Sequence, residues 1–248
     1  MKRLLVTALT VGALLAAVTP AATAATAPAA PVKVTSGPCQ YTATPDDPAV
    51  RPVSLPPDPR PTPDRGKVEV LISTSQGALP LRLDRAQAPC TVQSFLHLAH
   101  QRFYDFTTCH RLTAYPTLKV LQCGDPSATG EGGPGYKFAD ELPTTLPPAP
   151  NDPTGRRRIY SRGLLAMANA GPDTNGSQFF VVYGDSTLLP NYTVFGTVGA
   201  LGLHTLDRVA AGGIKPDADT PPGTTPVDGT PVRTTELRHV LPLCLFCG

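Results

Sequence analysis

The sequence lacks an apolar run long enough to cross a membrane as a helix, which takes about 20 residues. Its one apolar run near the start, Leu4–Ala17, is shorter, and no stop-transfer charges follow it. Lys2 and Arg3 precede this run and the small residues Ala22-Thr23-Ala24 follow it, as in secretory signal peptides. We predict that residues 1–24 are cleaved and that the protein is secreted, without stable membrane insertion.

The chain also lacks an excess of charge of either sign. Its 21 Lys and Arg residues against 19 Asp and Glu residues give a net charge of +2. Cleavage would remove Lys2 and Arg3 and leave 19 basic against 19 acidic residues. A neutral surface does not attract phosphate-rich partners, so neither nucleic acid nor an anionic membrane is expected as the main partner.

A second Cys-x-x-Cys pair is missing as well. The sequence has one such pair, Cys244 and Cys247, and its other candidate metal ligands are His97, His100 and His110. The spacing of His97 and His100 fits the exposed face of a helix, and an oxidising compartment disfavours free thiols. Structural zinc usually needs four Cys or His ligands, so we expect no metal site.

The six cysteines form an even set, which in an exported chain indicates disulfides, although the sequence does not fix their pairing. Cys109 and Cys123 lie on segments that we expect to be neighbouring strands, and Cys90 begins a helix nearby. We predict one disulfide within this trio and a second one from Cys39 to the C-terminal tail.

Residues 25–66 contain eleven prolines and few large apolar groups. Such a segment cannot bury enough apolar surface to offset the entropy lost on ordering. We predict an extended, semi-stiff leader that is largely disordered. The rest of the chain, residues 67–248, is long enough for one domain with a sizeable core.

The pattern of this domain is that of many short strands and two helices. Residues 67–73 alternate between apolar and polar side chains as in a half-buried strand, Pro89 opens an amphipathic helix, and a second helix covers about 201–211. This pattern predicts a mainly β fold, a closed antiparallel barrel capped by two α-helices. Two proline-rich inserts, 142–158 and 215–232, are predicted to be surface loops.

The stretch from Gly163 to Phe180, GLLAMANAGPDTNGSQFF, combines two apolar segments with a polar loop. Leu164–Ala168 suits a buried strand, and the segment from Ser177 to Tyr183 suits a second one. The residues between them are typical of turns. Two strands joined by an ordered polar loop can present backbone amides and an aromatic face to one groove, which indicates a peptide-binding surface.

The same stretch carries a family resemblance. MANAGPDTNGSQFF resembles the central motif of the cyclophilin-type peptidyl-prolyl isomerases, and three further motifs agree with the family in its order. These are Cys109–Leu112 with Gln122–Pro126, Gly132–Glu141, and Tyr192–Gly196. The resemblance covers about residues 67–240. It implies a closed eight-stranded barrel with a helix over each end, and catalysis of X-Pro rotation in proline-containing polypeptides with no cofactor.

This reaction explains which residue types are needed. Rotation about X-Pro is slow because amide resonance imposes a barrier of about 18–20 kcal/mol. A fixed donor aimed at the prolyl nitrogen stabilises the twisted state, in which that nitrogen becomes a better acceptor. Arginine suits this task because it stays charged and has a planar fork of donors. Arg111 aligns with the family's catalytic arginine and is the one catalytic residue that we predict.

The resemblance also implies a substrate groove. Gln122 matches the glutamine that orients the substrate carbonyl, Asn169 the asparagine whose main chain pairs with the peptide, and Phe180 the aromatic floor of the proline pocket. Tyr192 stands where the family usually has histidine. The full set of predicted substrate-binding residues is Val120, Gln122, Ala168, Asn169, Ala170, Gln178, Phe180, Leu188, Leu189 and Tyr192.

Some positions depart from the family pattern. The loop between Arg111 and Gln122 is longer than usual, so that either Leu118 or Lys119 replaces the phenylalanine of the proline pocket. The chain has no tryptophan, and Leu188 stands where many cyclophilins carry the tryptophan that contacts cyclosporin. The resemblance therefore implies weaker inhibition by cyclosporin.

Taken together, the sequence predicts an exported, monomeric peptidyl-prolyl cis-trans isomerase that assists the folding of secreted proteins. Two alternatives remain open at this level. The departures at Lys119 and Leu188 also fit a proline-peptide binding module with weak or no turnover. The proline-rich leader fits a purely structural wall protein that binds nothing in the groove.

Overall fold

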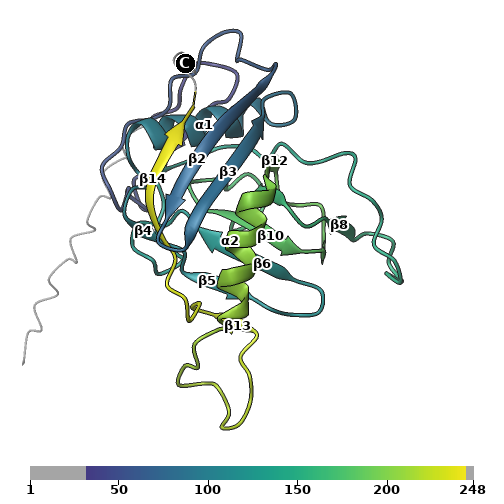
Figure 1. Cartoon of the computed structure of the whole chain (residues 1–248). Helices are drawn as coiled ribbons and strands as arrows, with labels where there is room; N and C mark the ends of the chain where they lie inside the picture. The colour runs from purple at the N-terminus through teal and green to yellow at the C-terminus, as the bar shows by residue number, and fades with distance from the viewer. Residues whose placement is uncertain (1–31, 244–248) are drawn as a thin grey trace, which may run out of the picture. The chain divides into compact units, whose positions relative to one another are not determined.

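The computed structural model describes residues 32–243. The predicted signal peptide and the cysteines Cys244 and Cys247 lie outside these residues. The described residues form one antiparallel ten-stranded sheet in the order β13-β5-β6-β10-β9-β12-β3-β2-β14-β4, and two small sheets, β1-β7 and β11-β8 (Figure 1). The strands are β1 Thr42–Ala43, β2 Lys67–Thr74, β3 Gly77–Asp84, β4 Thr107–Thr108, β5 Arg111–Thr113, β6 Lys119–Cys123, β7 Tyr136–Lys137, β8 Arg158–Tyr160, β9 Leu164–Met167, β10 Phe179–Gly184, β11 Ser186–Leu188, β12 Val194–Val198, β13 Asp228–Gly229 and β14 Glu236–Pro242.

The prediction of a mainly β fold with two helices is confirmed. Between residues 32 and 243 the strand pairings run from β13 to β4 and do not join these two end strands. The structure therefore shows a ten-stranded sheet, and the closed eight-stranded barrel stays a prediction. The two-residue strand β13 comes from the insert 215–232, which the sequence predicts to be only a loop.

Both helices begin and end close to where the sequence predicts. Helix α1, Pro89–His100, begins at its proline, whose missing N–H is not needed in the first turn. The next two backbone N–H groups donate to the carboxylate of Glu141, at 3.0 and 2.8 Å. Helix α2, Ala200–Ala211, contacts β3 and β10. Among residues 32–243, no helix is long and apolar enough to cross a membrane.

Strands β9 and β10 are buried on both faces, and their sequences are almost continuously apolar, whereas β5 and β6 also carry the half-buried polar side chains of Arg111, Lys119 and Gln122. Alternate residues belong to different clusters because side chains on a strand point to opposite faces. Leu121 and Val181 face the main core together with the rings of Phe95 and Phe195. The opposite face carries a second apolar cluster of buried residues: Val120, Tyr160, Ala166, Phe180, Val182 and Val194.

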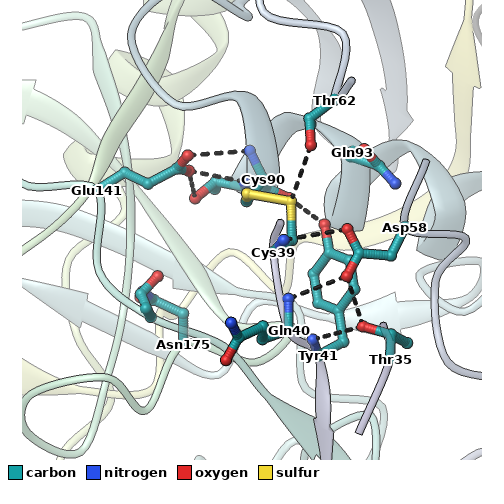
Figure 2. The surroundings of a disulfide bond; sticks show 12 residues. Thr35, Cys39, Gln40, Tyr41, Asp58, Thr62, Cys90, Gln93, Glu141 and Asn175 are labelled. Carbon is teal, nitrogen blue, oxygen red and sulfur yellow. Dashed lines mark hydrogen bonds between the residues drawn. A yellow bond between two sulfur atoms is a disulfide. The ribbon is translucent and has the colours of Figure 1, made fainter. Parts of the chain in front are cut away.

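The described part of the proline-rich segment, residues 32–66, makes specific contacts with the domain (Figure 2). Cys39 forms a disulfide with Cys90 at the start of α1. The carboxylate of Asp58 accepts hydrogen bonds from the backbone of Cys39 and from the hydroxyl of Thr35, and the buried Tyr41 hydroxyl donates to the Cys90 carbonyl at 2.7 Å. The sequence predicts a largely disordered leader, because its composition offers little apolar surface to bury. In residues 32–66 a disulfide to the domain and hydrogen bonds supply stabilisation in place of apolar burial.

The disulfides agree with one prediction and correct another. Cys109 and Cys123 are bonded to each other, so the bridge predicted within the trio is confirmed. The bridge predicted from Cys39 to the tail is wrong, since Cys39 pairs with Cys90. The physical reason is that β1 pairs with β7, and this pairing together with the Tyr41 bond holds the start of the segment beside the first turn of α1.

Candidate active site

Three residues assigned to the site by sequence are direct neighbours across three strands. Arg111 of β5 lies opposite Gln122 of β6, and Gln122 lies opposite Phe180 of β10. Opposed residues of antiparallel strands place their side chains on the same face of the sheet. The disulfide Cys109–Cys123 joins the segments that carry Arg111 and Gln122, so it also fixes their register.

A hollow of about 140 Å³ opens beside this row. Apart from Leu118, every residue that lines it belongs to the predicted site. The lining is formed by Arg111, Leu118, Val120, Gln122, Ala168, Asn169, Phe180, Leu188 and Tyr192.

One wall of the hollow is apolar and continuous with the second apolar cluster. Phe180 is 5% exposed, and its ring packs edge-on against the ring of Tyr192 with centroids 5.6 Å apart. Tyr192 in turn meets Tyr160, whose hydroxyl donates to the Tyr192 carbonyl at 3.1 Å. Leu146 of the insert 142–158 packs against the same cluster. This wall offers an apolar ring a dry surface.

The other wall is a chain of polar groups. The Gln122 side chain donates from Nε2 to Oε1 of Gln178 at 2.8 Å, and its own Oε1 accepts from Nη1 of Arg111 at 3.4 Å. Nε and Nη2 of Arg111 both donate to the carboxylate of Asp228, each at 2.6 Å. This carboxylate, mainly through its hydrogen bond, raises the pKa of Arg111.

A rigid loop supports the far end of this polar chain. Gln178 donates from Nε2 to the carbonyls of Gly130 and Gly132, at 2.8 and 3.0 Å. The buried carboxylate of Asp125 accepts from the backbone N–H groups of the same two glycines and of Ser127. Burial acts to raise the pKa of Asp125, but these bonds together outweigh it and leave the pKa below its ordinary value.

A larger depression of about 480 Å³ adjoins the hollow and shares Gln122, Ala168 and Asn169 with it. The predicted site residues Ala170 and Gln178 line this depression and not the hollow. Leu189 is the one predicted residue that lines neither. Thr44 and Asp47 of the leader also line the depression, and no pattern in the sequence predicts this.

Leu118, and not Lys119, takes the position that the sequence left open. Leu118 lines the hollow and packs against the second apolar cluster. Lys119 has its backbone N–H bonded to the hydroxyl of Ser186, and its side-chain carbons lie against Gly184. An aliphatic side chain therefore replaces the family's phenylalanine in the apolar wall.

Asp228 is the residue at this site that sequence reasoning missed. It is 117 positions from Arg111 and lies in an insert with five prolines that resembles an ordinary surface loop. The one local signal is the dipeptide Asp228-Gly229, which is typical of a turn. In the structure these two residues form β13 and pair with β5.

Comparison with known proteins agrees with this geometry. Residues 69–231 match the family model described as cyclophilin type peptidyl-prolyl cis-trans isomerase. The chain belongs to the cyclophilin family. It is 49% identical over 203 residues to "Probable peptidyl-prolyl cis-trans isomerase B" of Mycobacterium tuberculosis, covering 82% of this chain and 63% of that protein. A protein of the same name from Mycobacterium leprae is 52% identical over 190 residues, covering 76% and 64%.

A solved cyclophilin also resembles the structure. The crystal structure of a cyclophilin-type isomerase from Cryptosporidium parvum aligns with a TM-score of 0.55 and 28% identity, covering 72% of this chain and 99% of the other. The same Cryptosporidium protein was also crystallised in the presence of the dipeptide Ala-Pro. The chain spans less than two thirds of the length of the two mycobacterial relatives.

Proposed function

We propose that this cyclophilin is an exported peptidyl-prolyl cis-trans isomerase that accelerates X-Pro rotation in proline-containing polypeptides and so assists their folding. The observation that carries the proposal is the row Arg111–Gln122–Phe180 beside a hollow with one apolar and one charged wall. Family membership and the names of the relatives support the same activity.

The mechanism follows from the two walls. The proline ring enters the hollow against Phe180, Leu118 and Val120, which fixes the ring while the rest of the peptide turns. The Arg111 guanidinium then donates to the prolyl nitrogen as resonance is lost and this nitrogen becomes a better acceptor. No proton or electron is transferred, so the chemistry asks for no cofactor. Because the donor is already in place, little reorganisation is needed during the reaction.

The remaining predicted residues extend the groove on either side. The main chain at Asn169, between Ala168 and Ala170, is proposed to pair with the peptide backbone, and the 480 Å³ depression to receive residues that precede proline. Leu188 and Tyr192 close the apolar end. The Ala-Pro dipeptide used with the Cryptosporidium cyclophilin is the natural minimal probe for this hollow.

Export is part of the proposal. Two disulfides among the described residues fit an oxidising compartment. The predicted signal peptide, residues 1–24, supplies the route, although it lies outside the described residues. Expressing the full chain and sequencing the N-terminus of protein recovered outside the cytoplasm tests this part. An uncleaved chain retained in the cytoplasm would contradict it.

The activity is tested by exchange NMR on a short Ala-Pro peptide, which measures binding and cis/trans exchange separately. We expect catalysed exchange in the wild type and a loss of about 100-fold in kcat/KM for Arg111→Ala. Binding without exchange would instead identify a proline-peptide binding module, and no binding a structural protein.

Arg82 provides a matched control for this experiment. It is also a strand arginine paired with a carboxylate, that of Glu69 at 2.6 Å, but it lies in β3 outside the hollow. Arg82→Ala should keep wild-type exchange. Equal activity of wild type and Arg111→Ala would remove Arg111 from the catalytic role.

A further inference from the structure

Asp228 makes a contact with Arg111 that the proposed mechanism does not use. Its two carboxylate oxygens accept from Nε and Nη2 of Arg111 at 2.6 Å each, the side-on bidentate geometry of a strong arginine–carboxylate pair. Register supports the contact, since Asp228 lies opposite Thr113 and Gly229 lies opposite Leu112 in the β13–β5 pairing. Backbone pairing therefore holds the segment that carries this carboxylate beside β5.

The contact leaves the donors that catalysis needs available. A guanidinium has five N–H donors, of which Asp228 engages two and Gln122 one. The remaining two, on Nη1 and Nη2, lie away from the edge that Asp228 occupies. Arg111 lines the hollow and Asp228 does not. The carboxylate therefore contacts the guanidinium without forming part of the hollow's lining.

The exposure of the pair decides which effect of Asp228 matters more. The side chains of Arg111 and Asp228 are 41% and 30% exposed, so water screens the charge that the carboxylate would cancel. Water does not weaken the effect of this contact on the orientation of the Arg111 side chain in the same way. Arginine has four rotatable side-chain bonds, and a half-exposed arginine held by Gln122 alone, at 3.4 Å, would sample many rotamers. Two-point attachment to a carboxylate fixed by β13 removes that freedom.

We propose that Asp228, and with it the insert 215–232, is a positioning residue that holds the Arg111 guanidinium in its productive orientation. This inference rests on the proposed isomerase function. It assigns to one of the two proline-rich inserts a role in turnover, because this insert supplies the carboxylate that orients the catalytic side chain.

The test compares kcat and KM of the full chain for Asp228→Ala with those of the wild type, by exchange NMR on the Ala-Pro peptide. We expect kcat to fall about tenfold with KM changed less than about twofold, because misorientation affects the transition state more than ground-state binding. Asp228→Glu keeps a bidentate carboxylate and should recover part of the loss. If the alanine variant does not fold, kcat and KM are measured for Asp228→Asn, which keeps the size of the side chain but only one of the two acceptor oxygens. We expect kcat to fall in this variant as well.

A spectroscopic signature separates positioning from a merely structural role. The Nε–H of Arg111 should give a sharp, slowly exchanging NMR signal in the wild type, and this signal should broaden or vanish in Asp228→Ala. Glu69→Ala removes an equivalent carboxylate from Arg82 and should leave both the Arg111 signal and kcat unchanged.

Three results would overturn the inference. These are an unchanged kcat in Asp228→Ala, a raised kcat, which would make the carboxylate an inhibitor of Arg111, and an equal loss in Glu69→Ala. An inactive wild type would instead refute the proposed function itself, so the two failures are distinguishable.

Discussion

The two walls of the hollow differ in how they are built. The apolar wall is built on side chains of β6 and β10 that are almost fully buried, Val120 and Phe180, against which the half-buried Tyr192 packs. The polar wall consists of half-exposed groups that reach each other from distant segments, with Arg111 on β5 and Asp228 on an insert. The apolar wall is one face of a hydrophobic cluster. The polar wall forms where side chains from a strand end and from an insert meet through hydrogen bonds.

We expect this difference to separate effects on stability from effects on the proposed activity. A residue of the apolar wall contributes to both, because removing it opens a cavity in the core as well as the pocket. A residue of the polar wall contributes little to stability, since exposed ion pairs are worth about 0–1 kcal/mol. Substitutions in the apolar wall should therefore reduce stability and activity together, whereas substitutions of the ion pair in the polar wall should reduce mainly activity.

The largest effect is expected for Phe180→Ala in the apolar wall. Truncating this 5% exposed ring should lower the free energy of unfolding by about 3–5 kcal/mol and abolish measurable binding of the Ala-Pro peptide. Denaturant unfolding and peptide titration measure the two effects. Phe106, which is 65% exposed, is the matched control, and Phe106→Ala should cost less than about 1 kcal/mol. A loss of binding in Phe180→Ala at unchanged stability would show that the wall is not part of the core.

A smaller effect, confined to activity, is expected for Arg111→Lys in the polar wall. Lysine keeps the charge but not the planar fork that engages Asp228 and Gln122 at once. We expect kcat/KM to fall about tenfold while the free energy of unfolding changes by less than about 1 kcal/mol. Wild-type activity in this variant would mean that charge alone, and not orientation, is what the wall supplies.

The smallest effect is a pH dependence at the base of the polar wall. The pKa of Asp125 lies below its ordinary value of 3.8, because hydrogen bonds from the loop 127–132 outweigh burial. A lowered folded-state pKa contributes stability that is complete above the ordinary pKa and is lost as pH falls through the folded-state pKa. The protection of the Gly130 and Gly132 amides from hydrogen exchange should therefore decrease as pH falls below about 4.

Asp125→Asn supplies the control for this pH experiment, since asparagine does not titrate. Its amide protection, corrected for the intrinsic exchange rate, should be lower than in the wild type at pH 6 and should not change further between pH 6 and 3. A wild type whose corrected protection is flat over the same range would contradict the prediction.

The two proline-rich inserts show how far sequence reasoning reaches. Both are predicted as surface loops, and in the first insert Arg157 and Arg158 donate to backbone carbonyls. Leu146 nevertheless packs against the apolar wall, and Asp228 of the other insert engages Arg111. Composition gives no sign of these two contacts, because each joins the insert to a residue that is remote in the sequence.

The sequence by itself determined much of the local structure and predicted the residues of the candidate site. Period-two alternation assigns Leu121 and Val120 to opposite faces, Pro89 begins a helix, and the family's motifs name Arg111, Gln122 and Phe180. Only the tertiary structure decided the pairing of Arg111 with Asp228, the disulfide from Cys39 to Cys90 and the choice of Leu118 over Lys119. The physical reason is range: the periodicities of helices and strands act over a few residues, whereas contacts between remote segments depend on the register of strands and the path of loops that no local pattern encodes.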